Sequence, residues 1–334
     1  MKAYIKSIAY YLPEKIVTNE ELVAEFPEWT VEKIADKVGV DRRHVAGDEP
    51  VSSMAVKAAE SLFSENPDIN REDIDFVLVC TQSPDYFLPS TACIVQNKLG
   101  IPKTCGAFDF NLGCSGYEYG LATAKGYIAA GIAKNILLIT AEAYNKHIHP
   151  RDKGNRTIFG DAATATLVST EGYAEIGDFV LGTDGSGAEG LIVKTGGMAC
   201  PQKADDLIFD ENGNPHSSDY LYMNGAEIFN FTLRVVPKMV RQTLEKNSLT
   251  DADIDLYVFH QANGFMLNHL RKKLKITEDK FFINMANIGN TVSSTIPIAL
   301  YDAQKAGLLN GNVLIAGFGV GLSWGACTLK IINK

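Results

Sequence analysis

The stretch Asp73-Ile-Asp-Phe-Val-Leu-Val-Cys80 recurs 180 residues later as Asp253-Ile-Asp-Leu-Tyr-Val-Phe-His260. A second pair of motifs follows in the same order at an offset of 176 residues, Asn111-Leu-Gly-Cys114 and Asn287-Ile-Gly-Asn290. Each member of the second pair precedes a helix-like stretch. Ordered matches at nearly one offset are the mark of an internal repeat, so the sequence predicts two copies of one folding unit.

The spacing after these motifs agrees with the repeat. In each half the next apolar strand begins 23 residues after the motif ends, at Leu137 and at Val313. We therefore predict two related halves, residues 1–172 and 173–334, packed about a pseudo-twofold axis. Such packing would bring Cys114 and Asn290 to equivalent helix starts near that axis.

Strand-like and helix-like stretches alternate along the chain, which is typical of a layered α/β protein. Continuous apolar runs of four to eight residues are consistent with strands buried on both faces. The expected strands are 76–80, 135–139 and 162–168, and the expected helices include 52–64 and 115–130. Residues 184–219 are rich in Gly, Asp, Asn and Pro and are expected to form an irregular loop.

The composition fits a globular protein and narrows its function. Of 334 residues, 46% are hydrophobic and 21% are charged. The net charge of −9 repels phosphate backbones, which disfavours nucleic acid as a partner. No apolar stretch reaches the roughly 18 residues of a membrane span. The first apolar run is too short for a signal peptide, so we expect no membrane span and no leader.

The cysteines and histidines indicate free thiols and no metal. The cysteines are scattered without a Cys-x-x-Cys pair, which favours a reducing cytoplasm. They are Cys80, Cys93, Cys105, Cys114, Cys200 and Cys327. His147 and His149 lie two residues apart with no third ligand in view, so no metal site is expected.

Cys114 is the strongest candidate for a nucleophile. It stands between Gly113 and Ser115 at the start of a helix-like run. A helix N-terminus presents unpaired N–H groups and a partial positive charge, which stabilise a thiolate and lower the thiol pKa. The alternative is a small buried cysteine without chemistry.

His260 is the first polar residue after an apolar strand, a place where α/β sheets carry their sites. A neutral imidazole there could donate a hydrogen bond to a carbonyl or move a proton. A structural histidine is the alternative. Asn290 could cap a helix or act as a fixed amide donor to a developing oxyanion.

The glycine-rich stretch from Gly317 to Gly325 does not fit a dinucleotide fingerprint. Its glycines are too closely spaced, and nine residues after Gly325 leave no room for a βαβ unit. A close approach of the backbone to a reacting group fits better, with N–H groups available for an oxyanion hole. Asp161 is expected to stabilise a turn rather than act as an acid.

Together these motifs resemble the 3-oxoacyl-(acyl-carrier-protein) synthase III family of the thiolase-like superfamily. Cys114, His260 and Asn290 resemble its Cys-His-Asn triad. Nearly the whole chain contributes to the resemblance, through Tyr11-Leu-Pro-Glu-Lys-Ile-Val-Thr-Asn-Glu-Glu-Leu22, Gly39-Val-Asp-Arg-Arg-His44, Leu88-Pro-Ser-Thr-Ala92, Phe159-Gly-Asp161 and Gly321-Leu-Ser-Trp-Gly-Ala326.

The resemblance implies a layered αβαβα fold, a homodimer and a two-stage reaction. Cys114 would take an acyl group from acyl-CoA. Malonyl-acyl carrier protein would then lose CO₂, and the enolate would attack the acyl thioester to give a 3-oxoacyl product in fatty acid or related lipid synthesis. His260 and Asn290 would donate hydrogen bonds to the thioester oxygen, and the backbone N–H groups of Cys114 and Val320 would form the oxyanion hole. The resemblance implies no metal or redox cofactor.

The resemblance also implies positions that contact substrates. Trp29 and Lys153 correspond to a tryptophan and an arginine that flank the CoA adenine, and a lysine lacks the flat face of arginine. Leu88 and Phe318 correspond to the acyl pocket, with Leu88 reaching the pocket of the partner subunit. The segment 29–39 is about four residues longer than is usual in the family.

Carrier-protein docking is implied for a basic helix. Phe265 stands where typical members carry an arginine for this purpose, and Arg271, Lys272 and Lys273 follow on the same expected helix.

Two alternatives to the condensing enzyme remain open at the level of sequence. The triad could transfer an acyl group to an oxygen or nitrogen acceptor in a specialised pathway, such as one for secondary metabolites or surface glycans. The chain could be a non-enzymatic scaffold paired with a related catalytic chain. Metal-dependent and serine hydrolases are disfavoured, because metal-ligand spacing and a Gly-x-Ser-x-Gly motif are missing.

Overall fold

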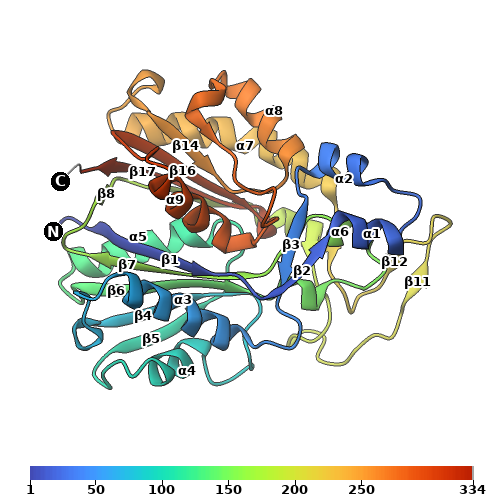
Figure 1. Cartoon of the computed structure of the whole chain (residues 1–334), viewed down its shortest axis with the longest axis horizontal. Helices are drawn as coiled ribbons and strands as arrows, with labels where there is room; N and C mark the ends of the chain where they lie inside the picture. Colours follow the sequence, from blue (N-terminus) through green and yellow to red (C-terminus); the bar gives the residue numbers. More distant parts are fainter. Residues whose placement is uncertain (333–334) are drawn as a thin grey trace.

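In the computed structural model, which describes residues 1–332, one mixed sheet of 11 strands runs through the protein. Its strands, in spatial order, are β15 (Phe281–Phe282), β14 (Leu256–Phe259), β16 (Asn312–Gly319), β17 (Ser323–Ile331), β8 (Ala174–Ile176), β1 (Tyr4–Tyr11), β7 (Ala162–Ser169), β6 (Asn135–Glu142), β4 (Phe76–Cys80) and β5 (Gly106–Phe110), with β9 (Val180–Thr183) paired to β17. Figure 1 shows these strands between helices.

The pairing pattern of one half of the sheet is repeated in the other. β4 runs parallel to β5 and β6, and β6 runs antiparallel to β7, which pairs with β1. In the same way β14 runs parallel to β15 and β16, and β16 runs antiparallel to β17, which pairs with β8 and β9. The two-half topology expected from the internal repeat is confirmed.

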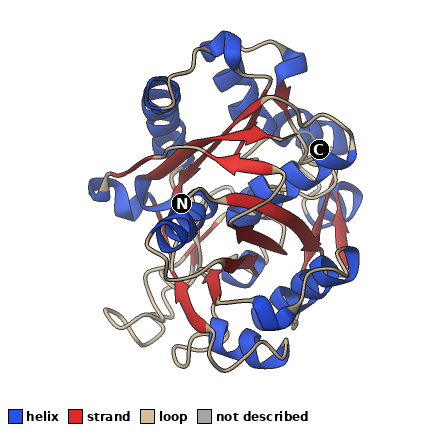
Figure 2. Cartoon of the chain, turned by 90° about the vertical axis from the view of Figure 1, so that its left-hand side faces the viewer, coloured by secondary structure: helices blue, strands red, loops and turns tan. Residues whose placement is uncertain are grey.

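The helices complete five layers. α5 (Gly116–Ala129) and α9 (Thr295–Lys305) contact strands of both halves and so lie between them. α3 (Val51–Glu65) and α4 (Thr91–Lys98) cover the outer face of the first half, and α7 (Gly225–Lys246) with α8 (Gly264–Leu274) covers that of the second. Figure 2 shows the strands enclosed by helices on both sides. The architecture is therefore αβαβα.

The repeated Asp-Ile-Asp motif makes the same hydrogen bonds in both halves. The Asp75 carboxylate accepts from the backbone N–H of Asn135 at 2.9 Å, and the Asp255 carboxylate accepts from that of Asn312 at 2.8 Å. Each asparagine amide donates back to the carbonyl of the first aspartate of its motif, at 3.0 Å in both cases. The motif thus ties the start of β4 to the start of β6 and the start of β14 to the start of β16. This shared structural role explains why the motif occurs in both halves.

The apolar runs are continuous because the strands are buried on both faces. In β4, Val77 and Val79 pack towards α3 and α4, whereas Leu78 packs into the middle layer beside α5. The expected strand 76–80 matches β4, and the other expected strands and helices differ from the observed ones by no more than three residues at either end.

Two further expectations concern less regular segments. The predicted boundary at residue 172 falls between β7 and β8, and as a division into two domains it stays a prediction. The expected loop 184–219 contains β10 (Leu191–Ile192) and the hairpin of β11 (Ile208–Phe209) and β12 (Pro215–His216). This hairpin extends from the layered body at the right of Figure 1.

The smaller elements lie at the end of the sheet from which the β11–β12 hairpin extends (Figure 1). They are β2 (Lys15–Thr18), α1 (Asn19–Glu25), α2 (Val31–Val38), β3 (Arg42–Val45), α6 (Lys153–Arg156) and β13 (Tyr222–Met223). Short 3-10 helices follow Thr291, at Val292–Ser294, and follow β16, at Val320–Leu322.

Two glycines of α5 provide a test of middle-layer packing. A methyl group at Gly120 would lie 2.5 Å from Cδ1 of Leu138, whereas one at Gly126 would meet nothing within 4 Å. We expect Gly120→Ala to lower the free energy of unfolding by about 1–3 kcal/mol through overpacking. Gly126→Ala should raise it by about 0.5–1 kcal/mol, because alanine favours a helix interior. Urea unfolding measures both, and equal effects of the two substitutions would contradict the packing.

Candidate active site

Cys114 lies two residues before α5, and the end of β16 passes directly over it. Its side chain is 7% exposed. A methyl group at Gly319, the last residue of β16, would lie 2.6 Å from Sγ of Cys114, so that position accepts only a glycine without rearrangement. The backbone N–H groups of Val320 and of Cys114 itself are directed at the sulfur.

Burial dominates the protonation of this thiol. It raises the pKa of Cys114 to about 12, although the two backbone N–H groups lower it. The expectation that the helix start yields a low thiol pKa is therefore wrong. The loss of hydration outweighs the favourable N–H groups, so the resting side chain is a thiol.

His260 follows β14 and is almost completely buried, with 1% of its surface exposed. Its backbone N–H donates to the carbonyl of Ala316, which places it beside β16. The ring nitrogen Nδ1 lies 2.7 Å from the hydroxyl of Thr295. Burial lowers the pKa of His260 to about 3, so its imidazole is neutral at physiological pH.

Asn290 is held by backbone groups on both sides of its amide. Its Oδ1 accepts from the N–H of Val292 at 2.9 Å, and its Nδ2 donates to the carbonyl of Ala262 at 3.2 Å. These two bonds fix the orientation of the amide, and they use only one of the two N–H groups of Nδ2. Asn290 can therefore make a cap-like bond to Val292 and still offer its second N–H to a substrate oxygen.

The carboxyl end of β16 brings the three candidates together. Phe318 makes an edge-on ring contact with His260, at 5.8 Å between centroids, and the next residue, Gly319, contacts Cys114. Asn290 bonds to Ala262, two residues after His260. Residues from both halves of the chain thus meet at the carboxyl ends of β14 and β16.

Sequence reasoning missed a polar pair beside Cys114. The hydroxyl of Tyr144 donates to Oε1 of Gln82 at 3.2 Å, and this oxygen would lie 2.6 Å from a methyl group at Gly113. Burial, followed by the charges of Cys114 and Glu142, raises the pKa of Tyr144 well above its usual value. Neither residue belongs to a motif, so the sequence offered no signal for them.

Two buried carboxyl groups also lie near the site. Glu142 accepts from the backbone N–H of Gln82 and the hydroxyl of Ser83, and burial raises its pKa to about 8. Both oxygens of Glu118 in α5 lack a hydrogen-bond partner among residues 1–332, and burial raises its pKa well above the usual value. The sequence signal for Glu142 is its position as a charged residue at the end of the mostly apolar strand β6.

Of the expected CoA contacts, Lys153 forms an ion pair with Glu28, the residue that precedes Trp29 in the chain. Nζ of Lys153 pairs with the Glu28 carboxylate at 2.5 Å and donates to the carbonyl of Asn212 at 3.1 Å. The ammonium groups of Lys33 and Lys37, both from α2, lie 4.9 and 6.0 Å from the Trp29 ring centre.

The expected acyl-pocket residues are separate within one chain. Phe318 is buried beside His260, whereas Leu88 is 83% exposed. The neighbouring Tyr86 and Phe87 are exposed as well. This apolar loop precedes α4 and points away from the chain's own core.

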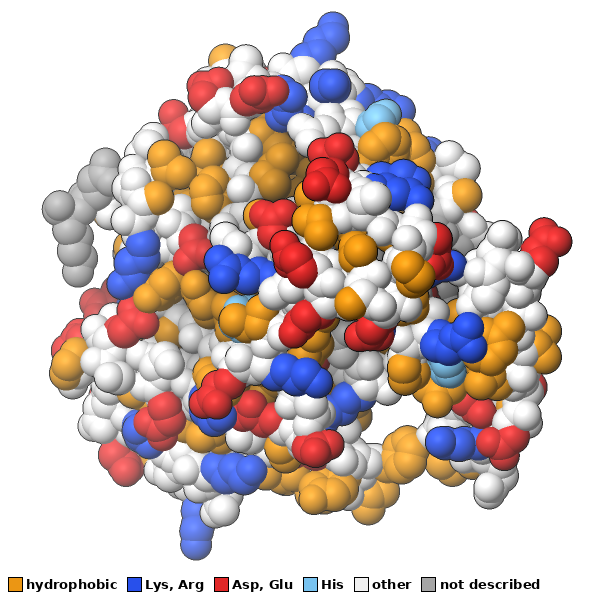
Figure 3. Space-filling model, turned by 45° about the vertical axis from the view of Figure 1, so that its right-hand side comes forward, with side chains coloured by type: hydrophobic (Ala, Val, Ile, Leu, Met, Phe, Trp, Pro, Cys, Tyr) orange, Lys and Arg blue, Asp and Glu red, His pale blue; other side chains and the backbone are white. Residues whose placement is uncertain are grey.

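The expected docking residues occupy the last turn of α8. Arg271 pairs with Glu278 at 2.6 Å, whereas Lys272 and Lys273 are exposed. Phe265 on the same helix is half-exposed and packs against Phe229 and His269. The surface in Figure 3 carries acidic and basic side chains interspersed with hydrophobic ones.

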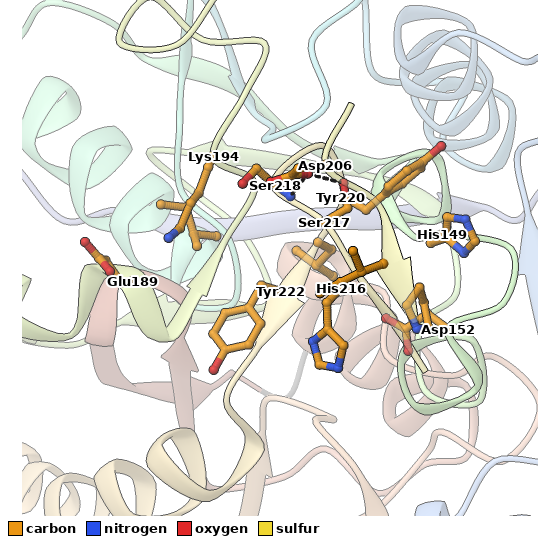
Figure 4. A pocket seen from close by; sticks show the side chains of 14 residues that line it. His149, Asp152, Glu189, Lys194, Asp206, His216, Ser217, Ser218, Tyr220 and Tyr222 are labelled. Atoms are coloured by element: carbon orange, nitrogen blue, oxygen red, sulfur yellow. Dashed lines mark hydrogen bonds between the residues drawn. The ribbon is translucent and has the colours of Figure 1, made fainter. Parts of the chain in front are cut away.

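A cavity of about 420 Å³ lies behind the β11–β12 hairpin and does not include the triad. Figure 4 shows His149, His216, Lys194 and Tyr222 on its walls, with the hydroxyl of Ser217 bonded to Asp206.

No cluster of three or more His, Cys, Asp or Glu residues that could hold a metal ion occurs among residues 1–332. Within the same residues, no helix is long and apolar enough to cross a membrane.

The repeated five-layer architecture, with the site at the strand ends, defines a thiolase-like protein. Residues 108–185 match the family model of 3-oxoacyl-[acyl-carrier-protein] synthase III, and residues 244–331 match the model of its C-terminal part. The chain is 39% identical over 324 residues to beta-ketoacyl-[acyl-carrier-protein] synthase III of Clostridium perfringens strain ATCC 13124, covering 96% of this chain and 97% of the relative.

Solved structures agree with this assignment. A 3-oxoacyl-(acyl-carrier-protein) synthase III crystal structure is 46% identical with a TM-score of 0.96, covering 99% of this chain and 100% of the other. The synthase III of Pseudomonas aeruginosa PAO1 is 29% identical with a TM-score of 0.88, covering 100% and 99%. The chain belongs to the 3-oxoacyl-(acyl-carrier-protein) synthase III family.

The raised thiol pKa predicts how Cys114 reacts in the unliganded protein. Below the pKa the thiolate fraction rises about tenfold with each pH unit, so alkylation of Cys114 by iodoacetamide should rise by about that factor per unit from pH 7 to pH 9. Peptide mass spectrometry measures the rate, with Cys114→Ala to assign the peptide. A rate that levels off near pH 7 would instead support a thiolate stabilised by the helix start.

Proposed function

We propose that this enzyme is an acyltransferase that condenses an acyl primer with a malonyl thioester, using Cys114 as the nucleophile. The observation that carries the proposal is the convergence of Cys114, His260 and Asn290 at the carboxyl ends of β14 and β16. Family membership supports the same reaction, because relatives across nearly the whole chain are beta-ketoacyl-[acyl-carrier-protein] synthases III.

The first stage loads the acyl group. The Cys114 sulfur forms a bond to the thioester carbonyl carbon of acyl-CoA, and the bond between that carbon and the CoA sulfur breaks. Because burial keeps Cys114 protonated, its proton must leave during the attack. The neutral imidazole of His260, a weak base at rest, accepts this proton in concert with the attack, as negative charge moves to the carbonyl oxygen, and passes it to the departing CoA thiolate. The backbone N–H groups of Cys114 and Val320 stabilise the negative oxygen of the tetrahedral intermediate.

The second stage forms the carbon–carbon bond. Malonyl-acyl carrier protein loses CO₂, and the electron pair of the broken bond develops as an enolate on the thioester oxygen. The free N–H of Asn290 Nδ2 and an N–H of His260 stabilise that oxygen. The enolate carbon then attacks the carbonyl carbon of the acyl group on Cys114. The bond from that carbon to Sγ breaks, the departing thiolate takes up a proton from solvent to restore the thiol, and the 3-oxoacyl product leaves on the carrier protein. Neither the acyl transfer nor the condensation, as written here, uses a resident metal or a redox cofactor.

Substitution of Asn290 should distinguish the two stages experimentally, because its side chain acts only in the second stage. We expect Asn290→Ala to retain acyl transfer from labelled acyl-CoA to Cys114 while CO₂ release from malonyl-carrier protein falls about 10²–10³-fold. His260→Ala should slow both stages, and Cys114→Ala should accept no label.

Mass spectrometry of the Cys114 peptide and trapping of labelled CO₂ measure these rates. No acyl-enzyme with any acyl-CoA or acyl-carrier protein would overturn the proposal. Acyl transfer to an alcohol or amine without CO₂ release would favour the alternative transferase.

Substrate contacts are proposed for three surfaces. Trp29 and Lys153 would hold CoA, and release of Lys153 from Glu28 would accompany binding. Phe318 would line the acyl pocket. Lys272 and Lys273 would dock the acidic carrier protein, with Arg271 at the edge of this surface because Glu278 already neutralises it.

A cytoplasmic location is proposed on the state of the thiols. All six cysteines of this chain are free, including the exposed Cys200. Such thiols persist in a reducing compartment.

A homodimer is proposed on the exposed loop formed by Tyr86, Phe87 and Leu88, because solvent exposure of three consecutive large apolar side chains marks an interaction surface. Leu88 would enter the acyl pocket of the partner subunit. Sedimentation should give twice the 36.3 kDa chain mass. Leu88→Asp should weaken association about tenfold or more by burying a charge, whereas Met198→Asp, also on an exposed apolar residue, should not. A monomer at all concentrations would contradict the dimer.

A further inference from the structure

The ring of His260 is oriented by one side chain of α9. Thr295, the first residue of that helix, places its hydroxyl oxygen 2.7 Å from Nδ1 of His260. Both side chains are almost entirely buried, so this hydrogen bond has no competition from bulk water. With Nδ1 engaged, Nε2 is the nitrogen left for a substrate or for Cys114.

The hydroxyl is in turn held by an unusual backbone. Val292 has a φ of +56°, in the left-handed region that β-branched residues seldom occupy. Its carbonyl accepts from the Thr295 hydroxyl at 3.1 Å, and its N–H donates to Oδ1 of Asn290 at 2.9 Å. One strained residue therefore supports two candidate catalytic groups, one through its carbonyl and one through its N–H. Strain of this kind persists where surrounding contacts over-determine the conformation.

We propose that Thr295 is a positioning residue for the condensation: anchored on the Val292 carbonyl, its hydroxyl fixes the His260 ring so that Nε2 faces the reacting groups, while the N–H of Val292 fixes Asn290. The inference rests on the proposed function, because His260 is a proton carrier and donor only in that reaction.

A hydroxyl suits this place because it can both donate and accept. When its hydrogen lies on the Val292 carbonyl, its oxygen accepts from Nδ1–H, and Nε2 carries a lone pair that can take the Cys114 proton. When the hydrogen turns to Nδ1, Nε2 carries the N–H that stabilises an enolate oxygen. The hydroxyl can thus hold the ring in either tautomer, and a backbone hydrogen bond between the ring and Val292 adds to this anchoring.

Three substitutions separate positioning from packing. Thr295→Val keeps the shape and removes the hydroxyl, and Thr295→Ser restores the hydroxyl. Thr291→Val is the matched control, because the Thr291 hydroxyl is buried four residues away without a hydrogen-bond partner in the described part of the chain. We expect Thr295→Val to lower kcat for CO₂ release and condensation about 10- to 100-fold with little change in KM, by analogy with the loss on removing hydrogen-bond partners that orient metal-ligating histidines.

The other two variants should remain active. Thr295→Ser should recover most of the lost kcat, and Thr291→Val should match the wild type. In ¹⁵N spectra of the ring, the wild type should show one fixed set of His260 signals, and Thr295→Val should shift or broaden them. If Thr295→Val does not fold, Thr295→Ala, with less bulk at the helix start, takes its place in both measurements.

The possible results decide between the claims. An unchanged kcat and unchanged ring signals in Thr295→Val, with an active wild type, would overturn the positioning role. A serine variant no better than valine, or an equal loss in Thr291→Val, would assign the effect to packing and overturn it too. If the wild type neither loads nor condenses, the proposed function fails, and the ring spectra still decide whether Thr295 orients His260.

Discussion

Removal of water from the site determines its chemistry. The thiol of Cys114 and the imidazole of His260 are both buried, and burial drives each towards its neutral form, raising one pKa to about 12 and lowering the other to about 3. A charged pair of thiolate and imidazolium is therefore disfavoured at rest, although the backbone N–H groups at the start of α5 would favour the thiolate. The charge separates when a substrate supplies the carbonyl that receives it, and the same dry surroundings then strengthen every hydrogen bond to the developing oxyanion.

The symmetric fold supports an asymmetric site. β4 ends at Cys80 and β14 is followed by His260, and these are equivalent places in the two halves. The same holds for Cys114 before α5 and Asn290 before the helix that continues into α9. One half supplies the sulfur, and the other supplies the imidazole and the amide. The middle layer makes this possible, because α5 and α9 contact strands of both halves.

The sequence was sufficient for the two-half α/β architecture, because the repeat and the apolar runs are local patterns. It also led to Cys114, His260 and Asn290, whose catalytic roles stay predictions. The Asp-Ile-Asp motif recurs since it makes the same backbone hydrogen bonds twice, and strands buried on both faces give unbroken apolar runs. The sign of the Cys114 pKa shift could not be predicted in this way, because it depends on how completely β16 and its neighbours exclude water. Tyr144, Gln82 and Thr295 escaped notice for a related reason: their importance lies in contacts across the fold. The sequence likewise could not show that Leu88 is exposed on a loop while Phe318 of the same chain is buried, because both facts depend on the folded structure.

The short strand β8 has a mechanical consequence. It pairs with β1 on one side and with β17 on the other, so main-chain hydrogen bonds run without interruption across the middle of the molecule. Swinging the two halves apart would break the ladder of β8 with β1 or its ladder with β17. The two halves are thus joined by a continuous run of backbone pairing as well as by side-chain packing, which makes the sheet itself the strut between them.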